Sequence, residues 1–197
     1  SRGRINTDAT WMAAFQSVVD DYVKNIKRVI QNPHSQIVNF RTSKKAEQIK
    51  FWTPTMEERY GEVEKEDKLE EYYFGYNEVR STHDTMENRF VKYTLQSIGR
   101  RLSSIIATVL SSSQEELSER HRQIWTNYQD SLRRLSKHPF FKTVGRFDGM
   151  KQESLVLQSR LGYQQIYKDW LKLKRGIDLY NGAANIGTLQ IWEIYEL

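Results

Sequence analysis

Two glutamates near the C-terminal end of the sequence have a spacing that suits divalent-metal chemistry. Glu193 and Glu196 are three residues apart, so a helix would place both carboxylates on one face, where they can bind one divalent ion. A complete magnesium site needs more ligands from elsewhere in the chain. The alternative is a solvated helix edge, and the residues alone leave both interpretations open.

The histidines and glycines show no catalytic or metal-binding pattern. No two of the histidines have the i, i+4 spacing of a helical metal site, and His121 falls on the apolar side of its expected helix, which is typical of a packed imidazole. The sequence contains no cysteine, which excludes a thiolate zinc site and a cysteine nucleophile. It also lacks a glycine-rich phosphate loop and a G-x-S-x-G motif. A free-standing enzyme is therefore not expected.

Arginines on two expected helices are the candidate nucleic-acid contacts. The chain of 197 residues carries 30 Lys and Arg against 25 Asp and Glu, a net charge of +5. If the two helices run antiparallel, positions near 100 would face positions near 122 and form one electropositive patch for a phosphate backbone. Ordinary helix-surface charge is the alternative. The candidate nucleic-acid-binding residues are Arg100, Arg101, Arg120, Arg122, Arg133 and Arg134.

One segment of the chain is strongly acidic. Residues 56–71 carry a local net charge of −5, which leaves the rest of the chain at +10. A solvated helix face or loop explains such a run, and the alternative is a docking surface for a basic partner.

Helical periodicity dominates the sequence. Apolar residues recur at steps of three and four over residues 11–30, and Pro33 ends this first expected helix. The same pattern predicts two long helices, at about 84–110 and 114–137, joined by a short serine loop. The sequence therefore predicts an all-α fold, a helical bundle built around a long antiparallel helical hairpin, with minor extended segments.

The expected organisation has three parts. Residues 1–75 would hold the N-terminal helix and an irregular acidic segment, residues 76–187 the helical hairpin domain, and residues 188–197 the truncated start of a following domain. The absence of an initiator Met and the apolar helical pattern at the end predict a fragment of a longer protein. No apolar run approaches the ~18 residues of a membrane span, so we expect a cytoplasmic protein without a membrane partner.

Four polar residues open the first helix of the expected hairpin. Asp84 and Glu87 have the spacing of a capping box, in which each side chain bonds the backbone amide near the other residue. Asn88 and Arg89 lie one turn further on, where capping requires nothing. They are expected to hold a neighbouring element by hydrogen bonds, and contact with DNA is the alternative.

Three stretches of the sequence together resemble a known family. The first, within Thr82–Lys92, reads Asp-x-x-Glu-Asn-Arg-Phe-Val-Lys; the second comprises His138–Phe141 and Leu157–Trp170; the third is Ile194–Leu197. In this order they resemble the helical domain that precedes the PD-(D/E)XK nuclease domain in proteins related to McrC, the nuclease subunit of the McrBC modification-dependent restriction system. The resemblance spans about residues 75–197.

The resemblance implies a role in prokaryotic defence. In such systems the nuclease works with a GTP- or ATP-driven AAA+ partner on foreign or modified DNA. Glu196 would be the first acidic residue of the nuclease fold, and Mg²⁺ would belong to the parent nuclease, because the later D…(D/E)-x-K residues are missing from this sequence. No cofactor is expected in the fragment itself.

The leading hypothesis is therefore a non-catalytic helical scaffold and linker domain of a McrC-like restriction nuclease. It would position the nuclease and offer a basic face to double-stranded DNA or a surface to the AAA+ motor. The alternative is a protein-interaction helical bundle with no nucleic-acid role, in which the acidic residues 56–71 are the docking site.

Overall fold

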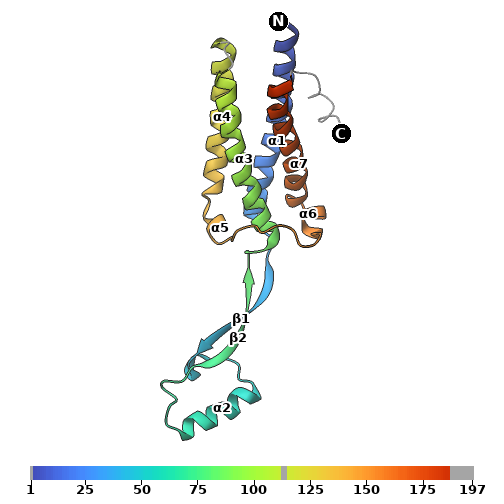
Figure 1. Ribbon diagram of the computed structural model, residues 1–197. Coiled ribbons are helices and arrows are strands. Elements are labelled where there is room, and N and C mark those ends of the chain that lie inside the picture. The colour runs from blue at the N-terminus through green and yellow to red at the C-terminus, as the bar shows by residue number, and fades with distance from the viewer. Residues whose placement is uncertain (1, 112–114, 187–197) are drawn as a thin grey trace. The chain divides into compact units, whose positions relative to one another are not determined.

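The computed structural model describes residues 2–111 and 115–186, and it divides the chain into two compact units. Unit 1 contains residues 1–34 and 83–197, and unit 2 contains residues 35–82 (Figure 1). Unit 2 is therefore an insertion: the chain leaves unit 1 after His34 and returns to it at His83.

Unit 1 is built on four long helices among its described residues. They are α1 (Arg2–Gln31), α3 (Met86–Ser111), α4 (Glu115–Ser136) and α7 (Tyr163–Ile186), with two short helices, α5 (Pro139–Lys142) and α6 (Leu155–Ser159). Helix α1 packs against α4 and α7, and α3 packs against the same two helices, so each long helix contacts two others (Figure 1). The long helices predicted at 84–110 and 114–137 correspond to α3 and α4.

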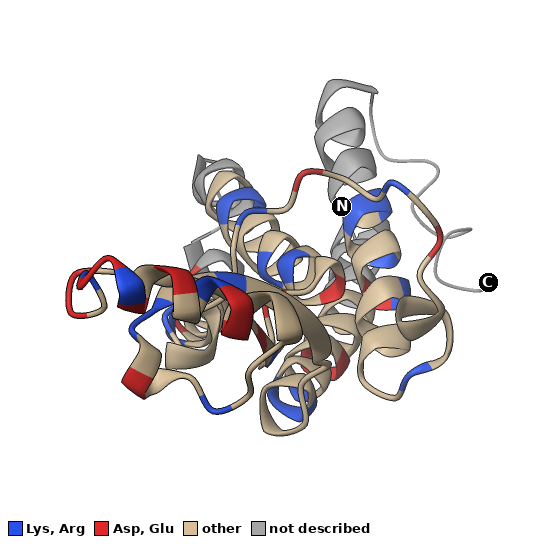
Figure 2. Cartoon of the chain, turned by 90° about the horizontal axis from the view of Figure 1, so that it is seen from below, with Lys and Arg blue, Asp and Glu red and all other residues tan. Residues whose placement is uncertain are grey.

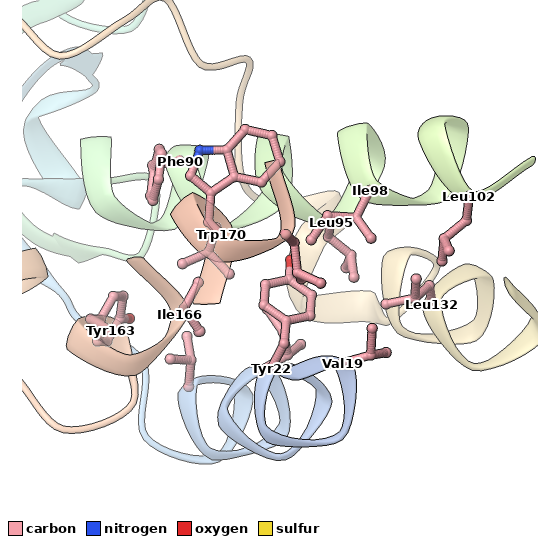
Figure 3. Packing of buried hydrophobic residues seen from close by; sticks show 14 of the residues in the cluster. Val19, Tyr22, Phe90, Leu95, Ile98, Leu102, Leu132, Tyr163, Ile166 and Trp170 are labelled. Carbon is pink, nitrogen blue, oxygen red and sulfur yellow. The ribbon is translucent and has the colours of Figure 1, made fainter. Parts of the chain in front are cut away.

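One apolar core holds the four long helices together. Every third or fourth residue of α1 from Phe15 to Val29 is buried, as the helical period of 3.6 residues requires for a face turned inward. These residues meet inward faces of α3, α4 and α7 (Figure 3). The largest fully buried members include Phe15, Tyr22, Ile98, Trp125, Leu132, Tyr163 and Ile166.

Unit 2 is a long two-stranded ribbon with a small aromatic cluster. Strands β1 (Gln36–Lys44) and β2 (Phe74–Thr82) pair antiparallel from Gln36 opposite Thr82 to Lys44 opposite Phe74. Between them lie a short 3₁₀ helix, η1 (Ala46–Gln48), and α2 (Pro54–Lys65). The ring of the buried Phe74 contacts the rings of Trp52, Tyr60 and Tyr72.

The local sequence explains where α2 begins. Thr53 is its N-cap and accepts a hydrogen bond from the amide of Met56, and Pro54 occupies the first helical position, where its missing N–H costs nothing. The acidic residues 56–71 lie on α2 and the loop that follows it, as Figure 2 shows.

The prediction of an all-α fold is wrong. The described residues form seven α-helices and a two-stranded antiparallel sheet, a mixed architecture. The ribbon is longer than the minor extended segments that the sequence predicts, because it is covered on one side only and carries apolar residues on both faces. Ile37 and Val79 lie on one face, and Val38 and Phe40 on the other, so the sequence lacks the apolar and polar alternation of a half-buried strand.

The domain division expected from the sequence stays a prediction. The structure groups the first helix with the helices after residue 83, and the expected third part, 188–197, lies outside the described residues. Within the described ranges, no helix combines the length and the apolar character needed to cross a bilayer.

Candidate functional site

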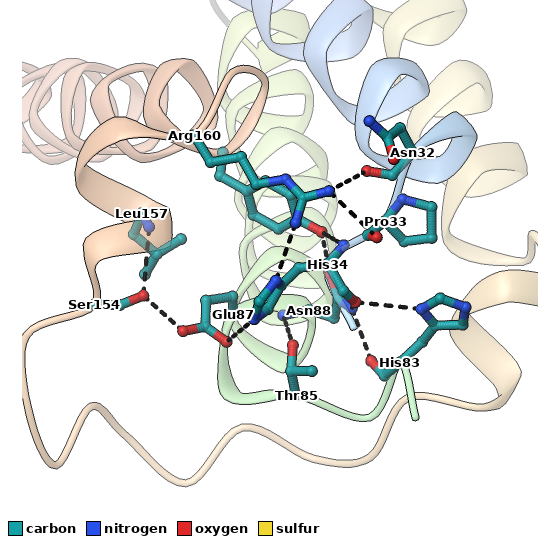
Figure 4. Close-up of polar contacts among 11 residues, drawn as sticks. Asn32, Pro33, His34, His83, Thr85, Glu87, Asn88, Ser154, Leu157 and Arg160 are labelled. Carbon is teal, nitrogen blue, oxygen red and sulfur yellow. Dashed lines mark hydrogen bonds and ion pairs between the residues drawn. The ribbon is translucent and has the colours of Figure 1, made fainter. Parts of the chain in front are cut away.

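A polar cluster lies where the chain leaves and re-enters unit 1, and we call it the crossing cluster (Figure 4). It joins the end of α1, the start of α3 and the segment that leads into α7. Its members are His34, His83, Thr85, Glu87, Asn88, Ser154, Arg160 and Tyr163.

The N-cap of α3 is Thr85, so the predicted capping box is wrong by one residue. The Thr85 hydroxyl accepts a hydrogen bond from the Asn88 amide at 3.3 Å, and α3 begins at Met86. Thr85 is buried, and its hydroxyl alone provides the side-chain acceptor for this amide in the first turn of α3. The side chains of Asp84 and Glu87 are thereby left to bind other parts of unit 1.

Asn88 ties the two crossing points of the chain together. Its side-chain amide donates to the carbonyl oxygen of His34 at 2.9 Å and to that of His83 at 2.7 Å. Its Oδ1 atom accepts from the Tyr163 hydroxyl at 2.6 Å. Asn88 is fully buried, and both of its donors and its acceptor are used. A buried amide satisfied in this way fixes the geometry of all three segments that it contacts.

Tyr163 completes the connection from α7. Its hydroxyl donates to Asn88 and accepts from the backbone amide of His34 at 2.6 Å. Burial raises the pKa of Tyr163, opposed by the His34 hydrogen bond and the nearby charge of Arg160, so the phenol stays protonated and able to donate.

The ring of His34 lies between a cation and an anion. Its Nδ1 atom is 3.0 Å from an Arg160 guanidinium nitrogen, which can only donate, so Nδ1 accepts and the ring proton is assigned to Nε2. That Nε2 atom is 3.9 Å from Glu87 Oε2. Arg160 also donates to the carbonyl oxygens of Asn32 and Pro33, which closes the C-terminal end of α1.

Glu87 connects the start of α3 to α6. Its Oε1 atom accepts from the Ser154 hydroxyl at 2.6 Å, and Ser154 is in turn the N-cap of α6, accepting from the amide of Leu157. Burial opposes ionisation of Glu87, but the Ser154 hydrogen bond and others hold its pKa below the usual range. The carboxylate is therefore ionised at neutral pH and already engaged.

Asp84 and Arg89 form a bidentate ion pair next to the crossing cluster. The guanidinium donates to both carboxylate oxygens at 2.7 and 2.8 Å, and the Gly145 amide donates to Asp84 Oδ1 at 2.8 Å. The Arg89 hydrogen bonds hold the pKa of Asp84 at about 2, below its usual value of 3.8. A Cβ atom at Gly145 would lie 3.2 Å from both partners, so the pair packs closely on this glycine. Lys92, one turn further along α3, donates to the Val144 carbonyl.

We expect the Asp84 and Arg89 pair to stabilise unit 1 by about 1 kcal/mol, because both side chains are about one-third exposed and solvent screens the pair. A double-mutant cycle of Asp84→Asn and Arg89→Gln, followed by urea unfolding, measures this coupling. Because the pKa of Asp84 is lowered in the folded chain, its contribution to the stability of unit 1 is present above pH 4 and is lost as the pH falls towards 2. Additive single effects at neutral pH would contradict the expectation.

The described part of the chain gathers no group of three or more His, Asp or Glu residues that would hold a metal ion. The polar atoms of Glu87, Asn88 and Tyr163 bind other protein groups, so the arrangement supports a structural role for the cluster. His138, the N-cap of α5, accepts from the Phe140 amide. The side chain of His121 lies outside the described residues.

The structure places the predicted nucleic-acid-binding arginines along α3 and α4. Ser103 accepts from Gln129 at 2.6 Å, which sets the register of the two antiparallel helices. At 1.5 Å per residue, Arg100 then lies at the level of Leu132, next to Arg133, and Arg122 lies about 15 Å further along, so positions near 100 do not face positions near 122 as expected. Arg122 is 3.9 Å from Glu119, and Arg133 is 3.0 Å from Asp130.

Arg100, Arg122, Arg133 and Arg134 are exposed, Arg101 is half-buried, and the side chain of Arg120 lies outside the described residues. Their role in binding DNA stays a prediction. Glu193 and Glu196 also lie outside the described residues, as does the third resembling stretch, Ile194–Leu197.

Sequence reasoning missed His34, His83 and Ser154 as members of a site. Two signals were present: His34 follows the Pro33 that ends α1, and Arg160 and Tyr163 lie in the second resembling stretch. The structure brings this stretch onto the first one through the Asn88 and Tyr163 hydrogen bond.

Residues 1–170 match the family described as "Domain of unknown function (DUF2357)". The chain belongs to this family. No curated protein and no solved structure matches the chain. The DUF2357 match covers every member of the crossing cluster, from His34 to Tyr163, and it also covers the inserted unit 2.

Proposed function

We propose that this DUF2357 chain is the non-catalytic helical scaffold and linker domain of a McrC-like restriction nuclease. One observation carries the proposal: the residues that produce the resemblance to McrC-like proteins are those that assemble unit 1. Asp84 and Lys92 bind the backbone of residues 144–145, Glu87 binds Ser154, and Asn88 binds Tyr163, while Arg89 holds the Asp84 carboxylate in place.

The contacts of these residues favour a scaffold over direct DNA binding for the first resembling stretch. Asn88 is fully buried, and Phe90 and Val91 belong to the apolar core. Side chains engaged in this way are withdrawn from a ligand on the surface. These contacts hold α3, α6 and α7 together, and a rigid unit of this kind can keep a following domain in a fixed position.

The remaining parts of the proposal come from the resemblance. The parent protein would be a cytoplasmic PD-(D/E)XK endonuclease of a prokaryotic defence system, working with an AAA+ GTPase or ATPase on double-stranded DNA. Glu196 would be the first acidic residue of its nuclease domain, and Mg²⁺ would be bound there with acidic residues that follow Leu197.

The proposal is tested in the full-length protein that contains this chain. Glu196→Gln is expected to abolish Mg²⁺-dependent cleavage of duplex DNA while leaving the urea unfolding of the protein unchanged. Asn88→Ala is expected to lower the stability and to reduce cleavage only in proportion to the unfolded fraction. The matched control is Glu153→Gln, an exposed glutamate on the loop before α6. Full cleavage by the Glu196→Gln protein would remove Glu196 from the proposal. Absence of a D…(D/E)-x-K pattern after Leu197 would remove the nuclease placement itself.

A second candidate function is a protein-interaction bundle that docks a basic partner on residues 56–71. The observation that favours it is the exposure of the acidic side chains on α2 and the following loop, of which only Glu62 and Glu66 form ion pairs with Arg59 and Lys68 among the described contacts. Charge reversal across Glu62–Glu71 would then abolish capture of that basic partner in a pull-down. Unchanged capture would remove this function.

A further inference from the structure

His34 is the last residue of unit 1 before the inserted unit 2, and its ring lies between two oppositely charged side chains. Arg160, from the segment between α6 and α7, has a guanidinium nitrogen 3.0 Å from the Nδ1 atom of the ring. Glu87, in the first turn of α3, has its Oε2 atom 3.9 Å from Nε2 (Figure 4). The two ring nitrogens therefore face a cation on one side and an anion on the other.

Only the neutral ring of His34 fits the contact with Arg160. A guanidinium donates hydrogen bonds and cannot accept them, so Nδ1 must offer a lone pair. Protonation of Nδ1 removes this lone pair and leaves two cationic groups 3.0 Å apart, where they repel each other. The charged ring and the guanidinium therefore exclude each other at this distance.

Only the charged ring of His34 fits a close contact with Glu87. The Ser154 hydroxyl donates to Oε1 of this carboxylate, and Oε2 is the atom that faces the ring. Burial opposes ionisation, yet the Ser154 hydrogen bond and others hold the pKa of Glu87 below its usual range, so the carboxylate is ready to receive a cation. At 3.9 Å the neutral ring makes no hydrogen bond to Oε2, whereas a protonated ring gains a charge-assisted one by moving closer.

We propose that His34 is a proton-controlled switch at the end of α1: the neutral ring holds Arg160, and the protonated ring releases Arg160 and binds Glu87. Histidine is the side chain that gains its charge between about pH 8 and about pH 5, so the exchange of partners occurs in this interval. This inference does not depend on the nuclease placement.

The other titratable groups around the ring do not oppose the exchange. The Nδ1 atom of His83 is 3.2 Å from the His34 carbonyl oxygen, so it is assigned as a donor, and it donates in the neutral and in the charged state of its own ring. The ring of Tyr163 meets the His34 ring edge-on at 6.5 Å, and burial raises the pKa of this phenol, so it stays uncharged. Among the described contacts, Arg160 and Glu87 are therefore the charged groups that distinguish the two states.

The switch controls how the C-terminal end of α1 is held. Arg160 also donates to the carbonyl oxygens of Asn32 and Pro33, at 3.3 and 3.5 Å, and both contacts are longer than its contact with His34. Release of Arg160 from the ring therefore weakens the closure of α1. The hydrogen bonds of the Asn88 side chain do not involve the ring, so unit 1 stays folded in both states.

Double-mutant cycles at two pH values test the switch. The unaltered chain, His34→Ala, Arg160→Ala and the double variant are unfolded with urea at about pH 8 and at about pH 5. We expect a coupling of about fivefold in the unfolding equilibrium constant at the higher pH and almost none at the lower pH. Titration of other groups in unit 1 contributes equally to all four proteins and cancels from the cycle.

A second cycle pairs His34→Ala with Glu87→Gln and is expected to show the opposite pH dependence. Its coupling is expected to be about threefold at the lower pH and almost none at the higher pH. His83→Asn is the matched control, because it removes the other imidazole at the crossing and keeps a side-chain donor for the His34 carbonyl oxygen. Both cycles are expected to be unchanged in this background.

Nitrogen-15 NMR of the folded, unaltered chain is a second measurement that needs no variant. It is expected to show Nδ1 of His34 without a proton at about pH 8 and both ring nitrogens protonated at about pH 5. The proposal is overturned by a ring that stays neutral at the lower pH, by a coupling to Arg160 that is equal at both pH values, or by a coupling to Glu87 that does not increase as the pH falls. Loss of the pH dependence in the His83→Asn background would assign the switch to the other histidine and overturn it as well.

Discussion

Replacing Asn88 by alanine is expected to lower the free energy of unfolding of unit 1 by about 3 kcal/mol. The substitution removes an amide that satisfies the carbonyl oxygens of His34 and His83 and the hydroxyl of Tyr163. Asn88 is fully buried, so water cannot replace it without rearrangement. Urea unfolding followed by tryptophan fluorescence measures the loss, since Trp125 and Trp170 belong to the core of unit 1.

The matched control for this substitution is Asn127→Ala. Asn127 lies exposed in the middle of α4, in the same unit. Alanine has the higher helix propensity, so this variant is expected to change the stability by less than about 0.5 kcal/mol. Equal effects at positions 88 and 127 would contradict the role assigned to Asn88.

The second large effect concerns Asp169, a buried carboxyl group on α7. Asp169 is 6% exposed, and its Oδ2 atom has no hydrogen-bond partner among the described residues. Burial and the neighbouring carboxyl group of Asp21 on α1 raise the pKa of Asp169 to about 8, against an opposing effect of Lys172. Tyr22 of α1 also lies close to this group.

The raised pKa makes the stability of unit 1 depend on pH. Between about pH 4 and pH 8 folded Asp169 keeps a proton that the unfolded chain releases, so stability falls as the pH rises. We expect a decrease of at least about 2 kcal/mol from pH 5 to pH 8, because one unit of pKa shift corresponds to about 1.4 kcal/mol. Thermal or urea unfolding at several pH values measures it.

Asp169→Asn removes this titration and keeps the size of the side chain. The variant is expected to be nearly as stable as the unaltered chain at pH 5 and about 2 kcal/mol more stable at pH 8. Asp148→Asn, at an exposed position of the same unit, is the control and is expected to show the pH dependence of the unaltered chain. A stability that rises between pH 5 and pH 8 would contradict the raised pKa.

The helices of unit 1 could be predicted because their apolar period is long and uninterrupted. The stripe of α1 ends before Pro33, and α3 and α4 each repeat the pattern over more than five turns. The ribbon could not be predicted in the same way. Its apolar residues lie on both faces, Ile37 and Val79 on the exposed one and Val38 and Phe40 on the other, so no apolar period of two appears in the sequence.

The crossing cluster shows a different limit of prediction. The pattern around Asp84 indicated a helix start and correctly placed polar side chains at it, but it gave no partner for any of them. The partners Ser154, Arg160 and Tyr163 lie more than 60 residues away in the sequence. Only the fold brings them to the start of α3, because hydrogen bonds of this kind leave no periodic signal.

The central claim is that the first and second resembling stretches form one structural connection through Asn88 and Tyr163. A double-mutant cycle of Asn88→Ala and Tyr163→Phe, measured by urea unfolding of the full chain, tests it most directly. The account predicts that the double variant loses at least about 1 kcal/mol less than the sum of the two single losses, because one hydrogen bond is counted in both. Strictly additive losses would contradict it.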